Sequence, residues 1–387
     1  MPGKHSAEVV GAGLAGLTAA IALAQRGWSV RLHERDSEVR AIGAGIYVWG
    51  NGLATLEALG LSDAATGAHV GPALESRDHR NRTIERVPIN GPGQPRVVTI
   101  MRDHLIGTLV RGAKDAGVEI RTGSEAVEAH PDGTLILRSG ETVRADVILA
   151  ADGVNSRLRR HYDVVARRAR MKQGAIRLTV PQSAEYVPAA DRDKYLEYFS
   201  GRRRVLYTPS SETSLYVALV ADEDDREASR IPVDAAAWTR SFPHLAALLS
   251  ACAGATGRWD TFEFLTLTRW SLGRLAFLGD AAHAQPPYLG QGGGCAMMSA
   301  LGLADALSTP GSPVDQRLRD WEYAQRPVVE HTQRWSYRLR KLNNLPDTAR
   351  SALLHAGALA PRLGASRMRA ARTVPTGHGR FAGAPPL

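Results

Sequence analysis

Two kinds of chemistry-bearing residue, glycine and aspartate, directly follow short apolar runs at three places in the chain. The first stretch, VVGAGLAGLTAAIAL at residues 9–23, carries three glycines within six positions. The other two, DVILAADG and RLAFLGD, end in Asp152–Gly153 and in Asp280. Turns of this kind at the ends of parallel strands present backbone N–H groups and carboxylates to phosphates and ribose hydroxyls. The sequence therefore predicts a dinucleotide site.

Each glycine of the first stretch has its own physical role. Gly11 permits a tight turn, Gly13 lets the backbone approach a pyrophosphate, and Gly16 allows close packing of helix on strand. Glu34 stands 18 residues after Gly16, at the end of the next apolar run, where a carboxylate accepts hydrogen bonds from ribose hydroxyls. Arg35, next to it, could pack on an adenine. This fingerprint leaves NAD and FAD open.

The elements expected around these turns alternate between strands and helices. Residues 7–34 have the pattern of a βαβ unit, with a strand, the glycine turn, a helix and a second strand. Helices are expected over residues 50–61 and 102–118. A hairpin and a strand are expected over residues 134–153. This order is typical of a parallel sheet covered by helices.

The second half of the chain begins with a different pattern. Polar and apolar residues alternate over residues 171–221, which favours antiparallel strands. A buried strand over 274–278 and a helix opening at QGGG then return to the first pattern. One long helix is expected from Asp315 to about Leu342, with Pro327 as a kink.

Taken in order, the three motifs resemble those of the single-component FAD-dependent aromatic hydroxylases, the p-hydroxybenzoate and salicylate hydroxylase type. The resemblance runs over about residues 7–340. It implies non-covalently bound FAD, with NADH or NADPH as reductant and O2 as co-substrate. The cofactor-binding residues that it implies are Gly11, Gly13, Ala15, Gly16, Glu34, Arg35, Arg102, Asp152, Gly153, Asp280, Pro287, Gly290, Gly292 and Gly293.

The family also implies a role for most of these side chains. Arg102 matches an arginine that reaches the flavin and its pyrophosphate. Asp152 and Gly153 match a motif that serves both FAD and the nicotinamide cofactor. Asp280 matches an aspartate that hydrogen-bonds the ribityl chain, and Pro287 opens the loop beside the isoalloxazine ring.

The resemblance implies an α/β fold, α+β overall: a Rossmann-like FAD-binding domain, an inserted antiparallel-sheet substrate domain and a long C-terminal helix. The expected FAD-binding domain begins with residues 1–165, which include pocket segments near 70–100, and returns over 269–345. The substrate domain is expected over 166–268. The remaining residues, 346–387, are expected to form a helix and a partly disordered tail.

Two departures from the common family pattern indicate one branch of it. The segments GGGCAMMSA and GAGIYVWGNGL look closest to oxygenases that hydroxylate 3-hydroxy-2-methylpyridine-5-carboxylate and open its ring. In that branch an arginine and a tyrosine twelve residues apart line the substrate sheet, and Arg204 and Tyr216 keep this spacing. Two other pocket tyrosines of the branch fall at Leu74 and Phe262.

Strand alternation gives Arg204 and Tyr216 the same parity. A hairpin centred near Ser210 would place them opposite each other on one face. We expect Arg204 to bind a substrate carboxylate or ring oxyanion, and Tyr216 to orient or deprotonate a ring hydroxyl. Tyr47 and Trp49 either wall the ring pocket or fill core. The expected substrate pocket comprises Tyr47, Trp49, Leu74, Phe262 and Pro287.

The implied activity is hydroxylation of an activated phenol or hydroxypyridine, carboxylated and small, through a flavin C4a-hydroperoxide, with or without ring opening. No catalytic metal is expected. Two alternatives stay open: an oxidase, reductase or halogenase on the same fold, or a flavin-binding redox sensor without catalysis. The WxWxIP-type halogenase motif is absent from the sequence.

The bulk composition favours a globular protein. The net charge of +9 comes mostly from scattered arginines without aromatic interleaving, so no nucleic-acid partner is expected. No membrane segment or signal peptide is expected, and two distant cysteines favour a reducing cytoplasm. We expect a monomer or homodimer. His283, Cys295 and Met297–Met298 are interpreted as packing residues.

Overall fold

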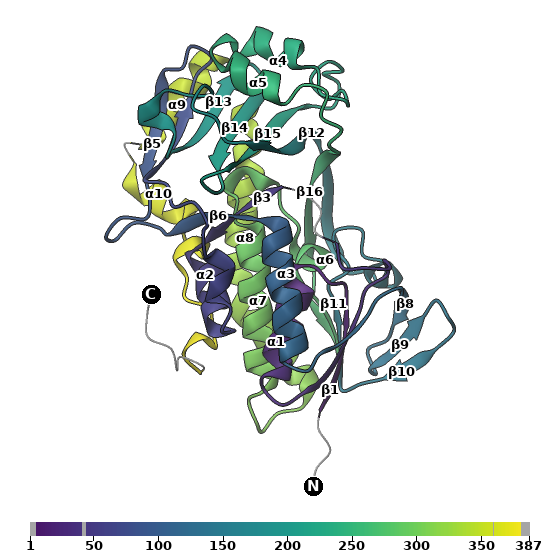
Figure 1. Ribbon diagram of the computed structural model, residues 1–387. Coiled ribbons are helices and arrows are strands. Elements are labelled where there is room, and N and C mark those ends of the chain that lie inside the picture. Colours follow the sequence, from purple (N-terminus) through teal and green to yellow (C-terminus); the bar gives the residue numbers. More distant parts are fainter. Residues whose placement is uncertain (1–4, 41–43, 359, 381–387) are drawn as a thin grey trace.

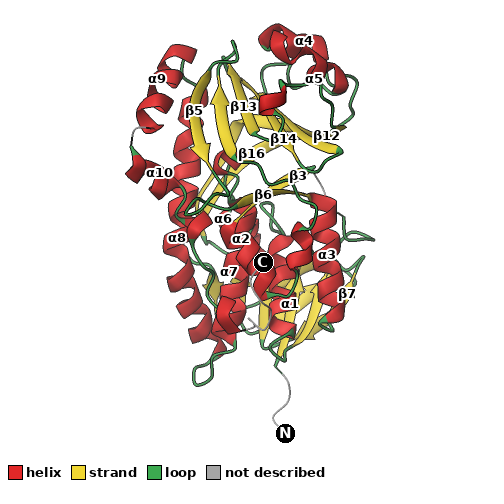
Figure 2. Ribbon diagram, turned by 60° about the vertical axis from the view of Figure 1, so that its left-hand side comes forward, coloured by secondary structure: helices red, strands yellow, loops and turns green. Residues whose placement is uncertain are grey.

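The computed structural model describes residues 5–40, 44–358 and 360–380. Figure 1 shows two stacked parts, with helices α1, α3 and α7 in the lower part and a broad twisted sheet in the upper part. The long helix α8 (Val314–Asn343) begins in the lower part and reaches the upper one (Figure 2). The expected single long helix is confirmed, and Pro327 lies inside it.

The lower sheet is the parallel sheet that the glycine motifs predict. Its strand order is β17–β18–β11–β1–β2–β7, and every neighbouring pair is parallel except β17–β18. Helices α1, α3 and α7 pack together on this sheet. The bounds are β1 (Ser6–Val10), β2 (Ser29–His33), β7 (Glu119–Arg121), β11 (Val147–Ala150), β17 (Ser271–Leu272), β18 (Leu275–Phe277), α1 (Leu14–Ala24), α3 (Arg102–Asp115) and α7 (Gly292–Leu307).

The strand order explains where a cofactor binds. From β1 the chain continues to β2 on one side, whereas β11 lies on the other side of β1. Ligands of open parallel sheets bind at such a switch point, outside the carboxyl ends of the strands. Here those ends lead into Gly11 and into Asp152–Gly153, which brings two of the three motifs together.

The upper sheet is almost entirely antiparallel. Its order is β16–β12–β15–β14–β13–β4–β5, and only β13 and β4 are parallel. Strands β4 and β5 come from the first hundred residues, as the expected pocket segments near 70–100 require. The bounds are β4 (Ala73–Arg77), β5 (Thr83–Pro88), β12 (Val165–Pro181), β13 (Tyr195–Ser200), β14 (Arg203–Pro209), β15 (Ser214–Asp222) and β16 (Trp259–Leu267).

The two-stranded sheet of β3 (Gly45–Trp49) and β6 (Val97–Met101) lies between the two parts (Figure 2). Helix α8 packs on α7 of the lower part and on β16 of the upper part. Its buried residues Leu318, Trp321, Gln325 and Val329 follow one another at three- and four-residue intervals, so they form one stripe along the helix. The other elements are α2 (Gly50–Ala58), β8 (Ala126–Ala129), β9 (Thr134–Leu137), β10 (Thr142–Arg144), α4 (Ala235–Ser241), α5 (Ala246–Ala251), α6 (Asp280–His283) and 3-10 turns at Ser62–Ala65, Leu158–His161, Ala189–Asp191, Pro243–Leu245, Pro287–Leu289, Ala370–Arg372 and His378–Arg380.

The end of the chain is more ordered than its composition suggests. Residues 346–358 and 360–380 form α9 (Asp347–Ala358), α10 (Pro361–Arg367) and two short turns, and α9 packs against β5. Arg350 is 1% exposed and donates to the carbonyl of Gly201 at 2.7 Å. The expected tail is thus largely helical as far as Arg380: α9 packs on the upper sheet, and the turns at Ala370–Arg372 and His378–Arg380 pack on α2. Residues 381–387 lie outside the described residues.

The hairpin of β14 and β15 differs from the expected register. Arg204 pairs with Val220 and Tyr216 pairs with Thr208, because the turn is centred about two residues beyond Ser210. Arg204 and Tyr216 do share one face of the sheet. The expectation that they lie directly opposite each other was wrong.

Candidate active site

The glycine turn after β1 has the geometry of a phosphate-binding turn. Gly11 has φ +101°, and a Cβ there would lie 2.5 Å from the carbonyl oxygen of Ala151. A Cβ on Gly16 would lie 2.0 Å from the carbonyl oxygen of Gly11. At Gly13 a Cβ would meet no described atom within 4 Å. The first and third glycines are thus required by packing, and the second leaves the backbone open to a ligand.

Glu34 lies at this turn, as expected. Its carboxylate accepts hydrogen bonds from the backbone N–H of Ala12 at 3.0 Å and of Asp36 at 3.1 Å. The neighbouring Arg35 side chain is 75% exposed and its nearest acidic partner is Asp36 at 3.9 Å. An exposed guanidinium at this end of the crevice remains free to cover an adenine.

Asp280 and Arg102 form the charged centre of the crevice. Asp280 begins α6, and a Cβ on the preceding Gly279 would lie 2.8 Å from the Cβ of Ala15, so this turn packs on the start of α1. The Asp280 side chain is accessible from the crevice, yet the surrounding protein desolvates it and raises its pKa, against the effect of Arg102. Burial lowers the pKa of Arg102, and the Asp280 carboxylate opposes that shift. Each charge therefore stabilises the other.

Asp152 helps to build the turn that carries it. Its Oδ2 accepts hydrogen bonds from the backbone N–H of Arg157 at 2.7 Å and of Leu158 at 3.3 Å. Its Oδ1 is buried and has no hydrogen-bond partner among the described residues. The next residue, Gly153, has φ +81°. One carboxylate oxygen is therefore structural and the other remains available to a cofactor hydroxyl.

The loop before α7 packs closely against β3. Gly290 has φ +60°, and a Cβ there would lie 2.8 Å from the Tyr47 ring. A Cβ on Gly293 would lie 3.0 Å from Ile46. Helix α7 begins at Gly292, so its free N–H groups and positive dipole end lie at this loop. Such a helix start stabilises negative charge on a ring placed beside Pro287.

These residues fit FAD. An open glycine turn, a carboxylate at the ribose position and a buried unpartnered oxygen on Asp152 lie at the carboxyl ends of β1, β2 and β11, and Asp280, which follows β18 of the same sheet, interacts with Arg102. Gly11, Gly13 and Gly16 would hold the pyrophosphate, Glu34 the ribose and Asp280 the ribityl chain. The loop from Pro287 to Gly293 would hold the flavin ring.

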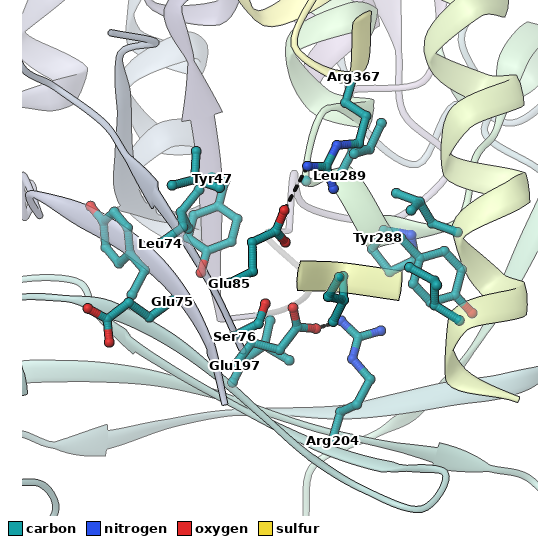
Figure 3. Close-up of a pocket in the computed structure, with 18 of the residues that line it drawn as sticks. Tyr47, Leu74, Glu75, Ser76, Glu85, Glu197, Arg204, Tyr288, Leu289 and Arg367 are labelled. Carbon is teal, nitrogen blue, oxygen red and sulfur yellow. Dashed lines mark hydrogen bonds and ion pairs between the residues drawn. The ribbon is translucent and has the colours of Figure 1, made fainter. Parts of the chain in front are cut away.

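A cavity of about 160 Å³ lies between this loop and the upper sheet. Figure 3 shows side chains from β3, β4, β5, β13, β14 and the C-terminal helices around it. The lining is mostly apolar or aromatic. Its residues are Tyr47, Trp49, Leu74, Glu75, Ser76, Glu85, Val87, Tyr195, Leu196, Glu197, Phe199, Arg204, Leu206, Pro287, Tyr288, Leu289, Gly290, Leu339, Leu342, Asn343, Leu354, Arg367 and Met368.

The carboxylates that line this cavity are paired with cations. Glu197 accepts a hydrogen bond from Arg204, and Glu85 accepts one from Arg367 at 2.8 Å (Figure 3). Glu75 forms ion pairs with Arg77 at 2.6 Å and with Lys194 at 3.2 Å. Burial opposes but does not prevent a lowered pKa at Glu75, because these hydrogen bonds favour its charged form. The charges of the lining therefore balance within the protein.

Arg204 lines the cavity, and its charge is already paired within the protein. The side chain is buried, and this burial lowers its pKa to about 10. The guanidinium lies over Phe199 and Tyr288, with its carbon 5.4 Å from each ring centroid. The guanidinium already has an anionic partner within the protein, because it donates a hydrogen bond to Glu197. Its Nε has no partner among the described residues.

The other predicted pocket residues divide into two groups. Tyr47, Trp49, Leu74 and Pro287 line the cavity. Tyr216 packs under Gly45, whose Cβ would lie 2.8 Å from it, and is outside the lining. Phe262 is also outside and meets Tyr288 edge to face, with ring centroids 5.8 Å apart.

Tyr47 and Trp49 thus wall a cavity while remaining largely buried. The Tyr47 hydroxyl bonds the hydroxyl of Thr208 at 2.9 Å, and burial raises its pKa. The Trp49 indole N–H is buried without a described hydrogen-bond acceptor. Together with the Nε atoms of Arg204 and Arg367, it makes three donors without partners among the described lining residues.

Sequence reasoning missed Glu197, Tyr288 and the lining residues of α9 and α10. A signal for Glu197 existed, because a turn at Gly201 pairs Phe199 with Arg204 and puts residue 197 on the same face. The tyrosine directly follows the predicted Pro287. The distant helices left no local signal.

The packing residues behave as interpreted. His283 is 3% exposed and stacks near Trp270, with centroids 4.9 Å apart. Cys295 is buried in α7, and burial raises its pKa to about 12.

Within the described ranges, no cluster of three or more His, Cys, Asp or Glu is arranged for a metal. No helix of the described chain has both the length and the apolar character to cross a bilayer.

The chain is similar to known proteins over nearly its whole length. Residues 4–336 match the family described as FAD binding domain. A probable 2-heptyl-3-hydroxy-4(1H)-quinolone synthase of Rhodococcus erythropolis is 47% identical over 375 residues, which cover 96% of this chain and 97% of that protein. A 2-heptyl-3-hydroxy-4(1H)-quinolone synthase of Mycobacteroides abscessus is 50% identical over 352 residues, covering 90% and 94%.

A solved structure gives the same answer at the level of the fold. The tetrameric form of 2-methyl-3-hydroxypyridine-5-carboxylic acid oxygenase superposes with a TM-score of 0.87 at 39% identity. The superposition covers 96% of this chain and 97% of that one. The expected α/β fold with its FAD-binding and antiparallel parts is confirmed by this match.

Proposed function

Because this chain belongs to the FAD binding domain family and is an FAD-dependent aromatic monooxygenase, we propose that it hydroxylates C3 of a 2-alkyl-4(1H)-quinolone. The family assignment argues against the oxidase, reductase and sensor alternatives. Two relatives near 50% identity carry the name of the 3-hydroxylated 2-heptyl product. A monooxygenase makes such a product from the quinolone that lacks the 3-hydroxyl.

The observation that carries the proposal is the charge balance of the cavity. Glu75, Glu85 and Glu197 line it, and each has a cationic partner within the protein. A carboxylated substrate would bring a further anion beside the carboxylates of Glu85 and Glu197, and its desolvation would have no unpaired cation among the described lining residues to offset it. A quinolone is uncharged. The lining therefore favours a neutral heteroaromatic ring over the carboxylated ring expected from the sequence.

The unsatisfied donors support a ring that carries a carbonyl. The Nε of Arg204 and the indole N–H of Trp49 lack acceptors among described residues. The C4 oxygen of a quinolone accepts hydrogen bonds, so it can satisfy one of these donors and fix the ring in the pocket. Arg204 keeps its proposed substrate-binding role, with a carbonyl as its partner. Tyr216, on the same sheet face, is proposed to position the ring from the crevice side.

The reaction balances with the substrates of the family. Quinolone, O2, NAD(P)H and a proton give 3-hydroxyquinolone, water and NAD(P)⁺. Bound FAD supplies the electron transfer from NAD(P)H and the activation of O2. The protein excludes water with the apolar walls at Leu74, Leu206 and Phe199, and it binds the ring oxygen. Carbon 3 is electron-rich because the ring nitrogen donates into it.

The test is substrate-stimulated NAD(P)H oxidation by the FAD-loaded protein, with product mass. We expect 2-heptyl-4(1H)-quinolone to stimulate oxidation and to gain one oxygen atom. The second candidate substrate is 3-hydroxy-2-methylpyridine-5-carboxylate, because the oxygenase of 39% identity acts on a ring of that description. Stimulation by this carboxylate and not by the quinolone would overturn the proposal.

A further inference from the structure

The last helices of the chain form one wall of the proposed substrate pocket. Leu354 of α9 and Met368, just after α10, line the cavity together with Val87 of β5. Leu339 and Leu342 of α8 complete this side. All five side chains are aliphatic or thioether groups. The charged side chains on the same elements, Glu85 and Arg367, are paired with each other at 2.8 Å, so the five apolar groups suit an apolar part of a ligand.

The C-terminal segment, residues 346–372, is fastened to the rest of the molecule around this wall. Arg367 pairs with Glu85 at 2.8 Å. The carbonyl of Arg367 accepts a hydrogen bond at 3.1 Å from Gln291, which lies in the loop from Pro287 to Gly293, called the cofactor loop below. The Trp335 indole donates to Ser366 at 3.0 Å. These contacts reach β5, the cofactor loop and α8. The wall is therefore held in place by three separate elements.

Helix α9 turns only one of two adjacent leucines toward the cavity. Leu354 is 7% exposed and lines the cavity, whereas Leu353 is 53% exposed. Neighbouring positions on a helix point about 100° apart, so the difference follows from the helix period. This pair gives the wall a matched control on the same helix.

We propose that the C-terminal segment forms an alkyl-binding arm of the pocket and sets the length of the chain at carbon 2 of the substrate. The inference rests on the proposed function, which supplies a quinolone with an apolar substituent. The proposed arm is the part of the cavity lined by Val87, Leu339, Leu342, Leu354 and Met368.

The quinolone ring and its chain would then use different walls. The ring lies toward Tyr47, Pro287 and Arg204, where the cofactor loop and the unsatisfied donors are. The chain lies along Val87, Leu354 and the two leucines of α8. Each buried methylene improves binding by about fourfold at the usual transfer free energy. Affinity should therefore rise with chain length until the arm is full.

The experiment measures dissociation constants by calorimetry for 4(1H)-quinolones with 2-methyl, 2-propyl, 2-pentyl, 2-heptyl and 2-nonyl substituents. The FAD-loaded wild type is compared with Leu354→Trp and with Val87→Phe, which fill the arm from two different elements. Leu353→Trp is the control. In the wild type, Kd should fall by about fourfold per methylene and level off near the longest chains.

Filling the arm should change only the response to long chains. Leu354→Trp and Val87→Phe should leave the Kd of the 2-methyl compound within about twofold and raise that of the 2-heptyl compound by ~60-fold, the loss of about three buried methylenes. Leu353→Trp should behave as wild type. The second variant serves if the first does not fold.

The outcomes separate the two proposals. If both variants weaken the 2-methyl and 2-heptyl compounds equally, or if wild type binds every chain length alike, the alkyl arm is overturned while quinolone hydroxylation stands. If wild type binds and oxidises no member of the series, the proposed function fails and the arm fails with it.

Discussion

At the residue scale, Arg204 shows what a strand pattern can and cannot predict. Alternation placed it on the inner face of the sheet with Tyr216, as the structure has it. Alternation does not reveal which charge lies across the next turn, and Glu197 on β13 neutralises the guanidinium. The position of Arg204 was therefore predictable, while its partner depended on a second hairpin, that of β13 and β14.

Replacing this arginine should weaken substrate binding without affecting the cofactor. Arg204→Met should raise the Kd of the quinolone by roughly ten- to a hundredfold, since a charge-assisted hydrogen bond is worth about 1.5–3 kcal/mol. Reduction of FAD by NAD(P)H without substrate should change little. Glu197→Gln, which keeps the cation, is the matched variant and should bind the quinolone more tightly than Arg204→Met. Equal binding by wild type and Arg204→Met would remove Arg204 from the site.

Asp280 should matter for the flavin itself. Asp280→Ala removes a carboxylate that faces the crevice beside Arg102, and should cost about 1–3 kcal/mol of FAD affinity. Titration of the apoprotein with FAD, followed by flavin fluorescence, measures the change. Asp315→Ala removes an exposed carboxylate on α8 and is the control. If both variants retain FAD like wild type, Asp280 does not hold the ribityl chain.

His283 should make the stability of the fold depend on pH. Burial lowers its pKa from 6.5 to about 4. Between these two values the unfolded chain binds a proton that the folded chain does not, so stability rises with pH. Unfolding free energy should fall by about 1.4 kcal/mol per unit as pH drops from 6.5 toward 4.

Denaturant unfolding at several pH values tests this dependence. His283→Gln should flatten the loss between pH 6.5 and 4, because glutamine does not titrate. His355→Gln changes an exposed histidine of α9 and should keep the wild-type slope. A wild-type slope in His283→Gln would show that other groups carry the acid sensitivity.

At the scale of elements, the cofactor turns were the easiest part to predict. Gly11 and Gly16 are local requirements, since each glycine avoids a clash with backbone a few residues or one strand away. The register of β14 and β15 was harder, because it depends on a turn of four polar residues, 210–213, with no glycine. Faces follow from alternation, whereas register follows from turn geometry.

The turn after β11 has a structural and a chemical function that can be separated. Asp152 accepts two backbone N–H groups of the following 3-10 turn. Asp152→Asn keeps an acceptor and should retain thermal stability, whereas Asp152→Ala should lose about 1 kcal/mol, as capping residues do. We expect both variants to slow flavin reduction by NAD(P)H when saturated with FAD.

Stopped-flow reduction and thermal unfolding, measured on the same samples, separate the two functions. An unchanged reduction rate in both variants would leave Asp152 as a turn residue only. A slower rate in Asp152→Asn at wild-type stability would assign the charge itself to nicotinamide use.

At the scale of the whole molecule, the order of three local motifs predicted the cofactor sheet, but nothing local predicted the closure of the pocket. Arg367 and Glu85 are 282 residues apart in sequence and 2.8 Å apart in space. The C-terminal segment is rich in alanine, arginine and glycine, so its sequence has few large apolar residues that would predict a contact with the core. Its order comes from a few buried anchors, Arg350 and Leu354 among them.

The same ion pair should decide how firmly the end of the chain is fastened. Glu85 and Arg367 have side chains only 9% and 17% exposed, so removing one partner leaves the other charge unpaired where little water reaches it. Arg367→Met should lower the unfolding free energy by about 2–3 kcal/mol, and adding Glu85→Gln should restore part of that loss. Thermal unfolding of the wild type, both single variants and the double variant measures the coupling. Arg319→Met breaks an exposed pair on α8 and should cost no more than about 0.5 kcal/mol. If the losses of the two single variants simply add in the double variant, the pair does not fasten the C-terminal segment, and the wall at Leu354 must be held by its apolar contacts alone.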